Sequence, residues 1–129
     1  MEEKNDPRWS RLGQSMWLAA FYDAAFAVAI LFFTAPAARL LNLALPEDLV
    51  YLRFNGVFLL MLAGMYLLPA FQPQRYRGVV SVAVIGRFLG FIYLGQVWAA
   101  GGSATFAALA FADLFFSVLH GVLLLRARS

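Results

Sequence analysis

The stretch SMWLAAFYDAAFAVAILFFT, residues 15–34, decides the fold class. It is apolar apart from Asp23, and a helix of about 20 such residues crosses the hydrocarbon layer of a bilayer. The whole chain has the same character, because 63% of its 129 residues are hydrophobic and only 13% are charged. Soluble domains carry about 25% charged residues. The sequence therefore predicts an integral membrane protein and excludes an ordinary water-soluble domain.

Three more apolar stretches follow the first, and together they predict an all-α membrane four-helix bundle in a single domain. The predicted transmembrane helices are 15–34, 46–68, 79–99 and 104–125. The segments outside them are a cytoplasmic lead-in (1–14), a short interfacial helix between the first two spans (35–45), a cytoplasmic loop (69–78) and a basic C-terminus (126–129). Short apolar segments that cannot span a bilayer are typical of interfacial helices.

Prolines and glycines set the predicted helix ends. Pro7 and Gly13 argue against a long helix in the lead-in. Pro46 followed by two acids is typical of a helix start, and Pro69 of a helix stop. The Gly101-Gly102-Ser103 sequence predicts a tight turn before the last span.

The distribution of Lys and Arg predicts the orientation. In a four-helix hairpin arrangement the N-terminus, the middle loop and the C-terminus share one side of the membrane. That side carries seven basic residues and the other carries one, Arg39; the seven are Lys4, Arg8, Arg11, Arg75, Arg77, Arg126 and Arg128. Basic residues concentrate on the cytoplasmic side. We therefore expect a multi-pass protein of the bacterial inner membrane with both termini in the cytoplasm.

Several kinds of chemistry are excluded by composition. The chain has no cysteine and one histidine, which leaves too few ligands for zinc or for a bis-histidine haem. It lacks the glycine-rich phosphate loop, GxSxG and HExxH motifs of soluble enzymes. The few basic residues are scattered, so no nucleic-acid partner is expected, and no cofactor is identified.

Ionisable side chains inside the predicted spans are the candidate site, because a charge at the centre of a bilayer costs about 2.5–3.5 kcal/mol and usually has a partner. At 1.5 Å of rise per residue, Asp23 and Arg87 each lie roughly 12 Å from the inner helix ends and could pair. Arg53 and Asp113 lie roughly 10–14 Å from the outer ends and could form a second pair. The candidates for ligand binding or a charge network are Asp23, Arg53, Arg87, Asp113, Ser117 and His120.

Three interpretations of these pairs stay open. They could only fix the register and orientation of the helices. The arginines could bind an anionic or carbonyl-bearing amphiphile through paired N–H donors. An aspartate could instead exchange a proton, since burial disfavours its charged form and an arginine favours it.

Small and polar residues indicate which helix faces point inward. Ser117 and His120 belong to a stripe at three- and four-residue spacing that should face the bundle, and a lone histidine there is more often a packing residue than a ligand. Gly86 and Gly90 form a GxxxG pair beside Arg87, which permits either close helix contact or a cavity. The thirteen phenylalanines are expected to face lipid.

Residues 51–98 carry YLRFNGVFLLMLAGMY, a basic loop and VIGRFLGFIYLG, two helices that each hold an internal arginine near glycine. This pattern resembles a broad group of small four-helix bacterial membrane proteins. The resemblance implies the fold and no particular activity.

A non-catalytic role is favoured. We expect a small membrane subunit that packs against a larger membrane complex or holds a hydrophobic small molecule near its Asp/Arg network. The alternatives are an oligomeric proton-coupled transporter of lipophilic compounds, and an intramembrane enzyme acting on a lipid-like substrate with His120 and the aspartates as acid-base groups. The bilayer itself, a larger complex and further copies of the chain are the expected partners.

Overall fold

The computed structural model describes residues 6–129, and Lys4 lies outside them. Regular structure in this part of the chain is all helical: α1 (Pro7–Phe32), α2 (Thr34–Leu40), α3 (Val50–Phe71), α4 (Arg77–Ala99) and α5 (Ala104–Arg128). The helices α1, α3, α4 and α5 are each long and apolar enough to cross a membrane. The short α2 lies where an interfacial helix was predicted.

The first helix begins earlier than the sequence pattern indicated. Pro7 does not interrupt α1, because it occupies the first helical turn, where its missing N–H needs no partner. Asp6 caps the helix by accepting a hydrogen bond from the backbone N–H of Arg8. Gly13 is also helical, and it permits a close approach: a Cβ atom there would lie 2.9 Å from the carbonyl oxygen of Ala70 on α3. The expectation of a lead-in without a long helix was therefore wrong.

Both ends of α3 differ from the predicted ones. The helix begins at Val50, not Pro46, and the Asp48 side chain accepts a hydrogen bond from the Val50 N–H at 3.0 Å. The acid thus supplies an acceptor just ahead of the helix. At the other end Pro69 is inside α3, which continues to Phe71, since a proline in the last turn removes one backbone hydrogen bond without ending the helix.

The turn between α4 and α5 is the one that the sequence predicted. Gly101 adopts a φ of 103°, which side-chain-bearing residues rarely adopt. Ser103 then caps α5 by accepting a hydrogen bond from the Thr105 N–H. The Thr105 hydroxyl donates to the carbonyl of Leu41, which ties this end of α5 to the segment after α2.

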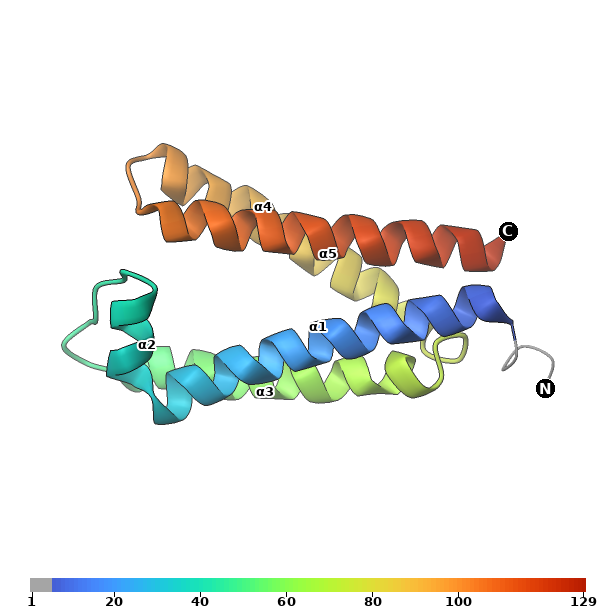
Figure 1. Ribbon diagram of the computed structural model, residues 1–129, viewed down its shortest axis with the longest axis horizontal. Coiled ribbons are helices and arrows are strands. Elements are labelled where there is room, and N and C mark those ends of the chain that lie inside the picture. The colour runs from blue at the N-terminus through green and yellow to red at the C-terminus, as the bar shows by residue number, and fades with distance from the viewer. Residues whose placement is uncertain (1–5) are drawn as a thin grey trace.

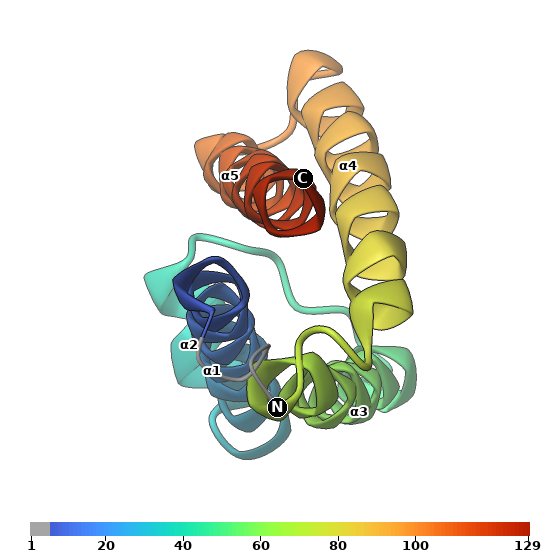
Figure 2. The ribbon, with the colours of Figure 1, turned by 90° about the vertical axis from the view of Figure 1, so that its right-hand side faces the viewer.

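The long helices pack as two antiparallel pairs, α1 with α3 and α4 with α5, and α1 also packs against α5. Figure 1 shows the pairs close together at the end that holds the start of α1 and the end of α5, and separated at the end that holds α2. Figure 2, viewed from the terminal end, shows α4 crossing at a steep angle to its neighbours. Contact between α3 and α4 is slight, so the bundle is open along that side.

Burial on α1 follows a single helical face. Leu12, Met16, Ala19 and Ala27 are fully buried at three- to four-residue spacing, in register with Asp23. The opposite face is apolar and exposed, as at Phe21, which is 75% exposed. An apolar exterior of this kind suits lipid as the surrounding medium.

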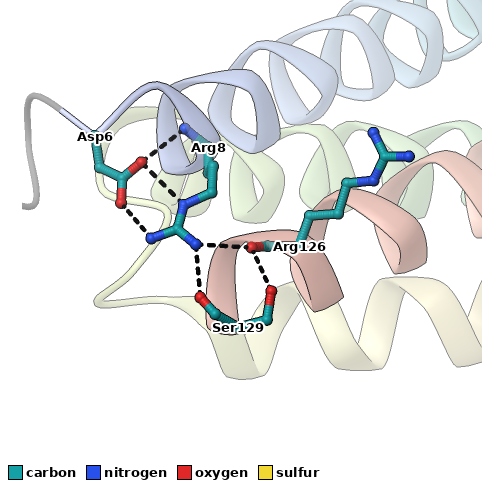
Figure 3. Close-up of polar contacts among 4 residues, drawn as sticks. All are labelled: Asp6, Arg8, Arg126 and Ser129. Carbon is teal, nitrogen blue, oxygen red and sulfur yellow. Dashed lines mark hydrogen bonds and ion pairs between the residues drawn. The ribbon is translucent and has the colours of Figure 1, made fainter.

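The start of α1, the end of α5 and the α3–α4 loop lie at the same end of the bundle (Figure 1). A polar contact joins the two ends: the Arg8 guanidinium forms an ion pair with Asp6 at 3.0 Å and donates a hydrogen bond to the Ser129 carbonyl at 2.6 Å (Figure 3). The hydrogen bond from the Arg8 side chain lowers the pKa of the partly exposed Asp6 carboxyl below its usual value. This contact fixes the start of α1 beside the end of α5.

Candidate functional site

The charged side chains gather around Arg87 of α4, in the middle of the bundle. Its Nη2 donates to Asp23 Oδ1 of α1 at 2.8 Å, and its Nη1 donates to Asp113 Oδ1 of α5 at 3.0 Å. We call these three residues the charge cluster. Asp23 is 1% exposed and Arg87 is 9% exposed, so the ion pairs are internal. Three helices that lie far apart in sequence are thus joined at one guanidinium.

Aromatic rings enclose the guanidinium of Arg87. Its central carbon lies 5.1 Å from the ring centre of Phe116 and 5.6 Å from those of Tyr22 and Tyr66. A cation within about 6 Å of a ring face is attracted by the ring quadrupole, and the attraction strengthens away from water. Tyr66 brings α3 into the site, so all four long helices contribute to it.

The predicted contact between Asp23 and Arg87 is present, and the predicted pairing of Arg53 with Asp113 is wrong. Asp113 binds Arg87 instead. Arg53 is exposed on α3, and α3 packs against α1, not α5. Among residues 6–129 no carboxylate lies within ion-pair distance of Arg53. Equal depth along two helices does not make them neighbours.

Ser117 and His120 lie on the buried face of α5, as the stripe predicted, but outside the charge cluster. The Ser117 hydroxyl donates to the Val84 carbonyl at 2.9 Å. His120 is fully buried, its Nδ1 lies 2.9 Å from the Ser15 hydroxyl, and its ring stacks on Phe116 at 5.6 Å. Both residues connect α5 to its neighbouring helices.

Sequence reasoning missed several participants. Phe116 was expected to face lipid, yet it is buried between Arg87 and His120. Ser15 was not considered as a partner of His120. Gly90 was only half of a GxxxG pair, but a Cβ atom at Gly90 would overlap Asp113 Oδ2, whereas Gly86 faces open space. The GxxxG pair around Arg87 was the one feature of the sequence that indicated a close contact at this place.

Two cavities reach the charge cluster. The first, of about 340 Å³, is lined by α1, α2, the α2–α3 segment and parts of α3, α4 and α5, and we call it the α2-side cavity. The second, of about 420 Å³, lies between α3 and α4 toward their connecting loop, and we call it the loop-side cavity. Both are lined by Asp23, Arg87 and Asp113, and otherwise mostly by apolar side chains. Within residues 6–129 no group of side chains is suited to hold a metal ion.

The fold and this site define a small helical protein with four membrane-length helices and a buried ion cluster between two apolar cavities. No known family, curated protein or solved structure matches the chain significantly. The resemblance noted over residues 51–98 therefore assigns no family.

Proposed function

We propose that this chain is a four-span protein of the bacterial inner membrane that binds a hydrophobic small molecule in its α2-side cavity, with the polar end of the ligand at the charge cluster. The supporting observation is that cavity. Its volume falls within the range of small-molecule sites, about 300–1,000 Å³, and its lining is apolar except around a few charged and polar side chains.

The placement of the start of α1 and the end of α5 at one end of the bundle (Figure 1) supports the proposed topology. In this proposal that end is cytoplasmic, because the arginines concentrate there. The α2-side cavity then opens in the outer half of the membrane. A ligand carried by lipid would reach it between α3 and α4, where the helices barely touch.

Binding of a ligand is favoured over a role as a subunit of a larger complex. Packing against a larger membrane complex would require exposed small-residue helix faces for a partner to cover. On α1 these residues are already used inside the chain: Ala19 and Ala27 are 0% exposed. The enzyme alternative has less support, because His120 lines neither cavity.

Native mass spectrometry of protein extracted gently from its own membranes tests the proposal. We expect a discrete adduct that is not a phospholipid. Leu109→Trp should remove it, because Leu109 lines the α2-side cavity and the indole would fill that space. The control is Leu125→Trp, at a 66% exposed position on the same helix, which should keep the adduct.

Two results would count against ligand binding. One is an adduct that persists in Leu109→Trp at wild-type occupancy. The other is co-purification of a larger membrane protein with no adduct, which would favour the subunit role. The same spectrum reports whether the chain forms homo-oligomers.

Proton-coupled transport of lipophilic compounds is the second candidate, and the loop-side cavity favours it. One set of charges lines two cavities that extend toward different ends of the bundle, as alternating access requires of a transport site. In proteoliposomes with an imposed pH gradient, uptake of a lipophilic dye should be lost in Asp23→Asn and kept in Asp48→Asn. Uptake that is independent of the gradient, or equal in both variants, would remove this candidate.

A further inference from the structure

At the polar end of the α2-side cavity both terminal nitrogens of Arg87 bind aspartates, while its Nε–H is buried without a partner among residues 6–129. Each terminal nitrogen of Arg87 already donates to a carboxylate, at 2.8 and 3.0 Å. Aromatic rings of Tyr22, Tyr66 and Phe116 surround the guanidinium. An incoming carboxylate or phosphate that binds both terminal nitrogens would have to displace Asp23 or Asp113. One that binds beside these aspartates would add a third negative charge to the cluster.

A hydrogen-bond acceptor of the charge cluster also lacks a partner. Asp23 Oδ2 is fully buried and has no hydrogen-bond partner among residues 6–129, although Asp23 lines the cavity. A buried carboxylate oxygen without a donor is costly, since it has lost its water and gained nothing in exchange. Asp113, which is half-buried, also lines the cavity. Asp23 can therefore accept one further hydrogen bond, from a donor that the described residues do not supply.

The net charge of the cluster also favours a cationic ligand. Two carboxylates face one guanidinium, so the ionised cluster carries one negative charge in excess. Low-dielectric surroundings make such an excess unfavourable unless a proton or a cation neutralises it. The remaining titratable groups near the cluster are Tyr22 on α1, Tyr66 on α3 and His120 on α5, and of these only His120 can become cationic, by binding a proton.

We propose that the charge cluster receives the ammonium head of a lipophilic amine, which lies with its hydrocarbon part in the α2-side cavity and competes with a proton for the cluster. This inference rests on the proposed function and specifies its ligand. An ammonium group has three N–H donors and one positive charge, so it serves Asp23 Oδ2 and removes the excess charge together. Phe26, Leu94 and Leu109 line the space for the alkyl chain.

Three ligands with one chain length separate the head groups: decylammonium, decanol and decanoate. Equilibrium binding to the full chain in phosphatidylcholine nanodiscs is measured for each, with empty nanodiscs subtracted. We expect saturable binding of decylammonium that is at least as tight as the binding of decanol. It should be roughly ten- to hundredfold tighter than the binding of decanoate, the ratio that a charge-assisted hydrogen bond supplies. Acidification should weaken it by up to about tenfold per pH unit where one proton competes with one cation.

Isosteric variants test whether the cluster is responsible. Asp23→Asn keeps an oxygen for Arg87 but removes the excess charge, so decylammonium binding should weaken and lose its pH dependence. Asp48→Asn, which changes a carboxylate outside both cavities, should bind as the unmodified protein does. The comparison of the three head groups needs no variant, so it remains decisive if Asp23→Asn does not fold.

The outcomes separate this inference from the proposed function. Tighter binding of decanoate or decanol than of decylammonium would overturn the amine assignment while leaving a hydrophobic ligand site. Decylammonium binding that is unchanged in Asp23→Asn, or not saturable, would overturn it too. The mass spectrum that compares the unmodified protein with Leu109→Trp is an independent measurement. An adduct that is missing from the unmodified protein, or that persists in this variant, would contradict the proposed function itself.

Discussion

Replacing Arg87 with methionine is expected to lower the free energy of unfolding by about 3–5 kcal/mol, the usual cost of leaving a buried charge without its partner. Methionine retains a flexible chain of similar length, so the change removes mainly the positive charge and the N–H donors. Asp23 and Asp113 would then face each other without the guanidinium that binds both. The measurement is reversible unfolding in mixed micelles, compared with the unmodified chain.

Arg53→Met is the matched control. Arg53 is also an arginine within a membrane-length helix, but it is exposed and has no ion pair in the described part of the chain. Arg53 lies in the first turn of α3, where its long side chain can reach the polar membrane interface, so we expect a change within about 0.5 kcal/mol. Comparable losses in Arg53→Met and Arg87→Met would contradict a special role for the charge cluster.

A compensated variant separates charge from packing. Arg87→Met combined with Asp23→Asn and Asp113→Asn removes all three charges, and breaking a buried pair costs more than replacing the whole of it. We therefore expect this triple variant to regain most of the stability lost in Arg87→Met. Failure to regain it would show that the shape of Arg87 among its aromatic rings, not its charge, is what the bundle needs.

Gly90→Ala is the second change with a large expected effect. The added methyl group would overlap Asp113 Oδ2, so the carboxylate has to move away from its position beside Arg87. Overpacking costs about 1–3 kcal/mol where the neighbouring group is held in place, and the ion pair with Arg87 holds the Asp113 carboxylate here. We expect a loss of stability in this range, measured by the same unfolding experiment, together with a weakened contact between α4 and α5.

Gly95→Ala on the same helix provides the control with the opposite sign. A Cβ atom at Gly95 would meet nothing within 4 Å. Alanine favours a helix over glycine by roughly 0.5–1 kcal/mol, so this variant should be as stable as the unmodified chain or slightly more so. If Gly90→Ala and Gly95→Ala changed stability alike, the close fit of Asp113 over Gly90 would not matter.

Most of the secondary structure could be predicted from the sequence because its causes are local. A long apolar run needs no knowledge of its neighbours to be recognised as a helix of membrane length, and all four such helices are present. The turn at Gly101 was predictable for the same reason, since only glycine readily adopts its backbone conformation. Errors occurred at helix ends, where Pro7 and Pro69 are accommodated in terminal turns.

The site was only partly predictable. Depth along the helix axis follows from residue counting, so the contact of Asp23 with Arg87 could be anticipated. Counting gives neither the rotation of each helix nor its neighbours, which is why Asp113 was assigned to Arg53. The aromatic rings over Arg87 come from three helices, and no spacing within one helix indicates them.

The sequence by itself determined that this chain is a set of four membrane-length helices with a few internal charges, because hydropathy, turn residues and helical rise act within each segment. Only the tertiary structure decided that Arg87 binds two aspartates, that Arg53 binds neither, and that one aspartate oxygen remains without a donor beside a cavity. The physical reason is packing. Helix neighbours and rotations follow from where the absence of a side chain, as at Gly13, Gly56 and Gly90, leaves room for atoms of another helix, and this depends on all the helices together.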